Sequence, residues 1–155
     1  DFCLSRGLGD VYKRQHMGIK KSECMAIQLN HIDLSDPAMP VLYIRYDNPK
    51  MRHKERKLRL EADLVPVLNE YLEQYQPRER LFECTARNLE YVLRHAGELA
   101  GLPESVSFEI LRMTCAVRDY EAGMALERLR KKLGLSSISW RDTSEKIQKL
   151  VSPPL

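Results

Sequence analysis

The stretch VLYIRYDNPKMRHKERKLRL, residues 41–60, is the part of this sequence that decides the fold. Residues 41–46 are rich in β-branched and aromatic side chains, and residues 56–60 alternate basic with apolar ones, so each segment is predicted to be a strand. Residues 47–55 join the two strands by a longer connection. The stretch therefore predicts an antiparallel hairpin with many positive charges.

Helical patterns surround this hairpin. Apolar residues recur every three or four positions from Leu64 to Tyr75, and in the helix after Ser107 the same spacing places Ile110 and Cys115 on the inner face, with Leu111 and Thr114. Further helices are predicted from Ser22, after Thr85, over 126–133 closed by Gly134, and from Ser139. The predicted class is α+β, mainly helical, with a small antiparallel sheet.

Length and composition limit the function classes. The chain has 155 residues, 43% hydrophobic and 30% charged, which is typical of one folded domain. No apolar run approaches the roughly 20 residues of a membrane span, so no membrane association is expected. The four cysteines form no Cys-x-x-Cys pair, which argues against a zinc module or a disulfide scaffold. We expect no metal site, a cytoplasmic location, and packing roles for Cys24 and Cys115.

The two ends of the chain differ from the rest. Residues 1–15, DFCLSRGLGDVYKRQ, show no apolar period and resemble translated sequencing-adaptor read-through, so we expect a non-native segment there. The natural reading frame is then expected to begin upstream of His16. The domain is predicted to cover residues 16–150, with a tail over 151–155.

Charge is unevenly distributed along the chain. Residues 45–59 carry seven Lys and Arg against two acids, a net charge of +5, whereas residues 60–110 carry four bases against ten acids, a net charge of −6. A basic hairpin can neutralise DNA phosphates and release counterions. The alternative is a solvated hairpin whose charges only keep the sheet edge soluble. The candidate nucleic-acid contacts are Arg45, Lys50, Arg52, Lys54, Arg56 and Lys57.

Six segments occur in the order and spacing of one family. They are GIKKSE (18–23), LNHID (29–33), ERKLRL (55–60), LFECTARNLEYVLRHAGELAGL (81–102), EILRMTCA (109–116) and LGLSSIS (133–139). Together they resemble the catalytic domain of tyrosine recombinases, the phage integrases. The resemblance implies that family's fold and double-stranded DNA as the partner, with other recombinase subunits as possible partners. It implies an attack by a tyrosine on the scissile phosphate, with two arginines, a lysine and histidines assisting, and no metal or small-molecule cofactor.

The family's catalytic positions are only partly kept in this sequence. Arg112 matches the second arginine of the family. Lys20 stands at the first arginine position, where it keeps the positive charge but lacks the planar guanidinium that can donate two parallel hydrogen bonds to a phosphate. The hairpin lysine is expected to be Lys50, with Lys54 as a second candidate. Three further positions are substituted: Glu109 and Leu135 replace histidines, and Ser144 falls near the position of the tyrosine.

Met113 replaces the residue that follows the second arginine in the family, a histidine. The last tyrosine in the chain is Tyr120 and the last histidine is His95, so the C-terminal segment lacks both a phenol and an imidazole. Arg112 has two open interpretations, a phosphate contact or the partner of a buried acid such as Glu23 or Glu109.

These observations predict a DNA-binding protein of the recombinase and integrase class, deficient in cleavage and associated with the nucleoid. Two alternatives stay open. The chain could be an active recombinase whose nucleophile comes from another subunit, or a recombinase-derived module that contacts only proteins.

Overall fold

The computed structural model describes residues 17–151. The predicted non-native segment 1–15 and residues 152–155 of the predicted tail lie outside this range. Among the described residues, no helix has the length and apolar character needed to cross a lipid bilayer.

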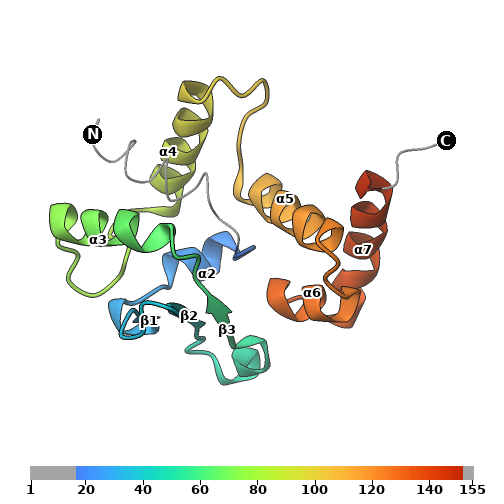
Figure 1. Ribbon diagram of the computed structural model, residues 1–155, viewed down its shortest axis with the longest axis horizontal. Coiled ribbons are helices and arrows are strands. Elements are labelled where there is room, and N and C mark those ends of the chain that lie inside the picture. The colour runs from blue at the N-terminus through green and yellow to red at the C-terminus, as the bar shows by residue number, and fades with distance from the viewer. Residues whose placement is uncertain (1–16, 152–155) are drawn as a thin grey trace.

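The predicted hairpin is confirmed and belongs to a three-stranded antiparallel sheet (Figure 1). Strand β2 (Val41–Ile44) pairs with β3 (Arg56–Arg59), with Leu42 opposite Leu58. Strand β1 (Ile32–Asp33), which the sequence analysis did not predict, pairs with the other edge of β2. The connection between β2 and β3 contains a 3-10 helix, η2 (Pro49–Lys54), whose first turn is capped by the Asn48 side chain.

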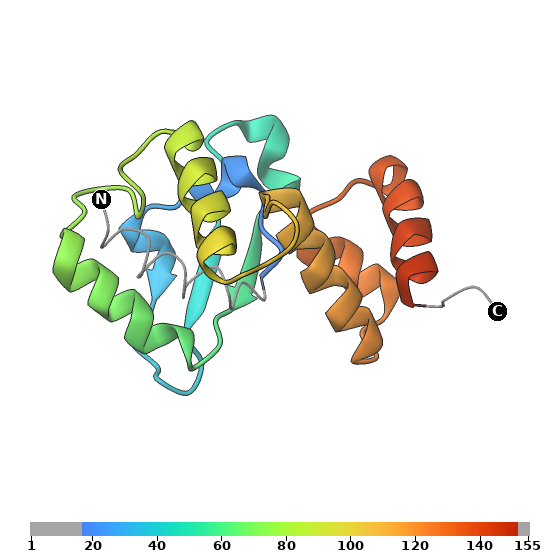
Figure 2. The same cartoon turned by 90° about the horizontal axis from the view of Figure 1, so that it is seen from above.

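The helices form two groups along the chain. Figures 1 and 2 show α5, α6 and α7 packed together at one end of the molecule, and α2, α3 and α4 with the sheet at the other end. The bounds are α2 (Lys21–Met25), the 3-10 helix η1 (Leu29–His31), α3 (Leu64–Tyr75), α4 (Ala86–Leu99), α5 (Phe108–Glu121), α6 (Leu126–Leu133) and α7 (Ser137–Val151).

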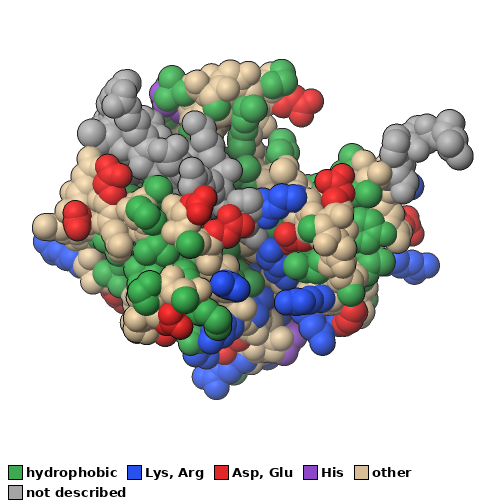
Figure 3. All heavy atoms as spheres, in the orientation of Figure 1, with side chains coloured by type: hydrophobic (Ala, Val, Ile, Leu, Met, Phe, Trp, Pro, Cys, Tyr) green, Lys and Arg blue, Asp and Glu red, His purple; other side chains and the backbone are tan. Residues whose placement is uncertain are grey.

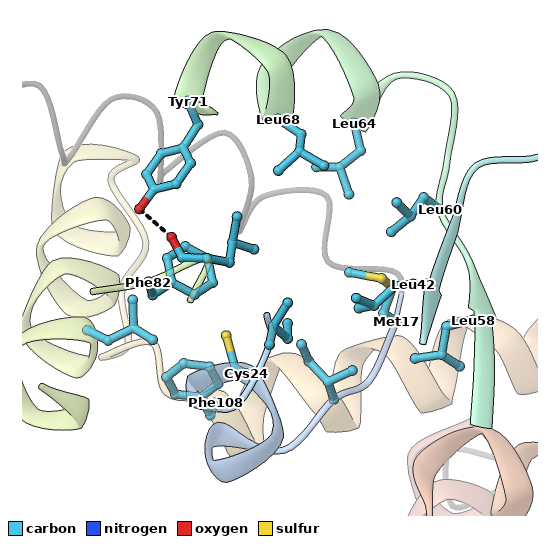
Figure 4. Packing of buried hydrophobic residues seen from close by; sticks show 14 of the residues in the cluster. Met17, Cys24, Leu42, Leu58, Leu60, Leu64, Leu68, Tyr71, Phe82 and Phe108 are labelled. Atoms are coloured by element: carbon cyan, nitrogen blue, oxygen red, sulfur yellow. Dashed lines mark hydrogen bonds between the residues drawn. The ribbon is translucent and has the colours of Figure 1, made fainter. Parts of the chain in front are cut away.

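The hydrophobic core follows the same division. The larger cluster joins the sheet to α2, α3 and α4, and Figure 4 shows its buried side chains, with the Tyr71 hydroxyl donating to the Leu81 carbonyl oxygen at 3.0 Å. The smaller cluster joins α5, α6 and α7 and includes Leu129 and Ile147, which are fully buried. Isolated helices of 8 to 15 residues are marginally stable in water, so the stability of α5, α6 and α7 depends on this packing.

Several local predictions are confirmed by side-chain geometry. The Thr85 hydroxyl accepts from the Asn88 main-chain N–H, and the Ser107 hydroxyl accepts from that of Ile110, each at 3.2 Å. Gly134 ends α6 in the left-handed conformation, as expected of a C-terminal glycine. The cysteines Cys24 and Cys115 are both buried, as predicted.

Several predicted boundaries and faces were wrong, including the strand predicted over 41–46, which ends at Ile44. Helix α2 begins at Lys21 and not at Ser22. It ends after five residues, and Ile27 lies in the loop that leads to η1. Helix α7 begins at Ser137, two residues before the predicted start. In α5, Cys115 is buried, but Ile110 and Thr114 are exposed, because the buried face runs through Phe108, Cys115, Ala116 and Asp119.

Candidate functional site

Three cations from distant parts of the chain converge on the C-terminal end of α6. Arg56 Nε donates to the Lys132 carbonyl at 2.7 Å, Arg112 Nη2 to the Leu133 carbonyl at 3.1 Å, and Lys20 Nζ to the Gly134 carbonyl at 3.3 Å. The last carbonyls of a helix lack partners within the helix and carry partial negative charge. The end of α6 therefore attracts one side chain from each of β3, α5 and the residue before α2.

The turn after α6 makes this convergence possible. Gly134 has φ +62°, a conformation that side chains other than glycine rarely adopt. A Cβ at this position would lie 2.6 Å from Arg56 Nη1, so the guanidinium occupies space that only a glycine leaves open. Glycine is thus required here both by the backbone and by the approach of Arg56.

A buried ion pair fixes the orientation of Arg56. Its two terminal nitrogens donate to the two carboxylate oxygens of Glu23, each at 2.8 Å, and Tyr46 donates its hydroxyl to the same carboxylate. Burial alone would raise the pKa of Glu23, but the hydrogen bonds and the charge of Arg56 hold that pKa below its usual range. Burial and the neighbouring Glu23 raise the pKa of Tyr46 to about 12, so this phenol stays protonated.

Lys20 lies in a strongly positive environment. Its main-chain N–H donates to Glu23 at 2.8 Å, which places the residue at the start of α2. Burial lowers the pKa of the Lys20 ammonium group, Glu23 opposes this shift, and the charges of Lys54, Arg112 and Arg56 lower the pKa further. Four cations thus lie close enough to interact, while Glu23 is the carboxylate that offsets them at Lys20.

Arg112 is held by a carbonyl and not by an acid. Both carboxylate oxygens of Glu23 accept from Arg56, and the described residues contain no ion pair between Arg112 and a carboxylate. Burial lowers the pKa of the Arg112 guanidinium, and the charges of Glu109 and Glu23 oppose this shift. The Nε atom of Arg112 is buried and has no hydrogen-bond partner among residues 17–151. The part of the chain that the structure describes therefore leaves one donor of this guanidinium unsatisfied, which is unusual for a purely structural arginine.

A groove of about 590 Å³ opens beside this cluster, between η2 and the α6–α7 turn. Lys54 at the end of η2 lines it, and Arg56 Nη1 donates to the Lys54 carbonyl at 3.2 Å. Lys50 is exposed in the first turn of η2 and does not line the groove. The structure thus brings Lys20, Lys54 and Arg112 to one place and leaves Lys50 outside it.

The substituted positions lie in different surroundings. Leu135 lines the groove with its half-buried side chain, and Glu109 is exposed one turn before Arg112 on α5. Ser144 is half-buried on α7, and its hydroxyl donates to the Arg141 carbonyl at 2.9 Å. Met113 packs against the smaller core cluster.

The remaining hairpin cations differ in exposure. Arg45 and Lys57 lie over the Tyr43 ring, at 5.3 and 5.7 Å from its centroid, and Arg45 also pairs with Glu55 at 3.4 Å. Arg52 is exposed in η2. Arg56, with a side chain only 10% exposed, is engaged inside the protein. Of the six predicted DNA contacts, those that can reach a ligand are therefore Arg45, Lys50, Arg52, Lys54 and Lys57.

Sequence reasoning missed several residues of the groove, among them two cationic or titratable ones, and one role. His53 and Arg130 both line the groove, and Arg130 Nη1 donates to the Leu135 carbonyl at 3.4 Å. His53 stands next to Lys54 in the basic run, which is the one signal that could have drawn attention to it. No pattern in the sequence shows that Arg56 joins the hairpin to α6, because that contact spans 76 residues.

Comparisons with known proteins support the fold. No family model and no curated protein matches the sequence. The structure is similar to that of XerA recombinase, with a TM-score of 0.71, 16% identity, and coverage of 100% of this chain and 65% of that one. It is also similar to XerH site-specific recombinase bound to difH substrate, in a post-cleavage complex (TM-score 0.72, 19% identity, 94% of this chain and 44% of that one).

A pre-cleavage complex of XerH gives a TM-score of 0.71 at 18% identity and covers 96% of this chain and 45% of that one. The chain thus spans about two thirds of XerA and less than half of XerH. At these identities the likeness concerns the fold. The predicted α+β fold, resembling the catalytic domain of tyrosine recombinases, is confirmed.

Proposed function

We propose that this domain binds the phosphate backbone of double-stranded DNA in a recombination or integration setting, and that it does not cut the strand. The observation that carries the proposal is the convergence of Lys20, Lys54 and Arg112 beside one groove. XerH, which has the same fold, is bound to its difH substrate in two solved complexes. In this domain the bound DNA would lie along the groove and the basic hairpin.

The electrostatics of the cluster favour an anion. Burial is the main cause of the lowered pKa of Lys20, and the charges of Lys54, Arg112 and Arg56 lower it further against the opposing charge of Glu23. A phosphate group would reduce the mutual repulsion of these cations, and its oxygens accept charge-assisted hydrogen bonds.

The expected mode of binding is weakly selective for sequence. Contacts to phosphates fix position and orientation but carry no base information. The exposed cations of the hairpin, Arg45, Lys50, Arg52 and Lys57, extend the positive surface beyond the groove. Affinity should therefore fall steeply with salt and vary little between duplexes of equal length.

The groove lacks the groups that the family's cleavage chemistry needs. Within residues 17–151 no tyrosine lines it, and the nearest phenol of the cluster, Tyr46, donates to Glu23. Leu135 cannot donate a hydrogen bond to a phosphate oxygen. Ser144 is absent from the groove lining and donates to a backbone carbonyl of its own helix. These substitutions support a binding role without cleavage.

The test is a comparison of two triple variants in duplex binding by fluorescence anisotropy. Changing Lys50, Arg52 and Lys54 to Ala should weaken binding at least tenfold, since each lost phosphate contact removes favourable free energy. The matched control changes the exposed Arg78, Arg87 and Arg94 to Ala and alters net charge equally. Equal loss in both variants, or no loss in the first, would refute the hairpin as the DNA contact and favour a module that binds only proteins.

A nicked suicide substrate tests the absence of cleavage. We expect no covalent protein–DNA adduct with this chain alone. An adduct would overturn the cleavage-deficient proposal. Adduct formation only after mixing with a recombinase that carries an intact tyrosine would support the alternative in which a partner subunit supplies the nucleophile.

A further inference from the structure

A second basic groove lies between β3 and α6. Its volume is about 400 Å³, and six of its nine lining residues are cations, whereas none is an acid. Figure 3 shows Lys and Arg side chains gathered where the sheet faces α6. The six cations are Arg56, Lys57, Arg59, Arg128, Lys131 and Lys132.

The lining of this groove differs from that of the candidate DNA groove, although Lys57 also belongs to the exposed hairpin cations proposed to extend the DNA surface. The two grooves share only Arg56 and Lys131 among their lining residues. Arg56 is fixed between them, because its guanidinium bonds to Glu23 and to the end of α6. A ligand in the second groove would therefore meet a different set of side chains from one in the first.

Four of the six cations in the second groove have no ion-pair partner among the described residues. Arg56 pairs with Glu23, and Lys132 pairs with Asp119, so these two cations are compensated. Among the described residues, no ion pair joins any of the other four cations to an acid. Like charges held this close repel one another, and a bound anion would relieve that repulsion.

The groove also has an apolar part. Met17 and Leu58 are buried at its wall, and Met124 is half-buried there. Methionine side chains adapt to the shape of a flat ring. Small-molecule sites typically have volumes of roughly 300–1,000 Å³, which places this groove at the lower end of the range.

We propose that the second groove binds a compact polyphosphate of the nucleoside triphosphate class. The four uncompensated cations would hold the phosphate chain, and the methionines would contact the base. This site goes beyond the proposed DNA-binding function and does not depend on it.

The experiment is a calorimetric titration of the chain with tripolyphosphate and with ATP, at about 0.15 M KCl to screen weak surface attraction. We expect saturable binding of one equivalent, with ATP tighter than tripolyphosphate because of the base. Changing Arg59 and Arg128 together to Gln should weaken ATP at least tenfold. A matched control with Arg87 and Arg94 changed to Gln should stay within twofold of the parent.

The outcomes separate this site from the DNA site. A short duplex at saturating concentration should leave ATP binding in place, and the Arg59 and Arg128 variant should keep its DNA affinity. Loss of ATP binding in the presence of duplex would show that the groove is part of the DNA surface and would overturn the proposal. No saturable binding, or equal weakening in the control, would also overturn it. Equal affinities for ATP and tripolyphosphate would refute the contact with the base.

Discussion

Replacing Glu23 by Gln should destabilise the fold far more than its single charge suggests. The Glu23 side chain is fully buried and that of Arg56 is 10% exposed, and two hydrogen bonds of 2.8 Å join them. Removing one partner of a buried pair leaves the other charge uncompensated, which costs about 3–5 kcal/mol. Gln keeps the volume and one acceptor oxygen, so we expect a loss at the lower end, about 3 kcal/mol.

The assay is urea unfolding at pH 7. The slope of the unfolding free energy against urea concentration should be the same for the parent and the variant, which checks that both unfold in the same way. The matched control is Glu90→Gln, which removes the exposed partner of Lys21, and it should cost at most about 0.5 kcal/mol. A double-mutant cycle that combines Glu23→Gln with Arg56→Gln should give a coupling energy of about 2 kcal/mol between the two residues. A loss for Glu23→Gln no larger than that of the control would refute the view that this buried pair holds the hairpin against α2.

The same pair gives a dependence on pH whose sign follows from the lowered pKa of Glu23. A carboxyl group whose pKa is lower in the folded state stabilises that state above its unfolded value, near 4.5, and loses this contribution as the pH falls through the folded pKa. The stability difference between the parent and Glu23→Gln should therefore be full above about pH 4.5 and shrink below it. A difference that grows on acidification would contradict this assignment.

Three further predictions concern the site. Gly134→Ala should destabilise the fold by about 1–2 kcal/mol in urea unfolding, because the residue is left-handed and the new Cβ would meet Arg56; no change would show that the turn relaxes freely. Binding of a short duplex should raise the pKa of Lys20, measured by NMR of the labelled side chain, because a phosphate stabilises the ammonium form; an unchanged pKa would place the DNA elsewhere. Lys54→Gln should weaken DNA binding more than Lys50→Gln in anisotropy titrations, because Lys54 lines the groove and Lys50 does not. The reverse order would show that Lys50, and not Lys54, is the lysine that contacts the DNA.

A large part of the fold is predictable from local sequence signals. The hydroxyl caps at Thr85 and Ser107 and the glycine that ends α6 act within a few residues, so their patterns can be interpreted without knowledge of the tertiary structure. The exposed face of α5 was not predictable in this way. Ile110 has the spacing of a core residue but lies on the surface, because the packing of α5 against α6 and α7 decides which face is buried.

The candidate site was only partly accessible from the sequence. Lys20 and Arg112 came from the resemblance to a family, and their closeness in space agrees with it. The choice between Lys50 and Lys54 depends on how η2 folds within the connection between β2 and β3, which the strand pattern does not specify. The role of Arg56 depends on Glu23 and on the end of α6, and neither is near it in the sequence.

The central claim is that the cations beside the α6–α7 turn contact DNA phosphates. The most direct measurement is the slope of log affinity against log salt concentration for the parent and for a variant with Lys20 and Lys54 changed to Gln. If each lysine contacts one phosphate, the slope should become shallower by about 1.8, since each contact contributes about 0.9. An unchanged slope with unchanged affinity would show that these lysines do not meet the DNA backbone, and the account would fail.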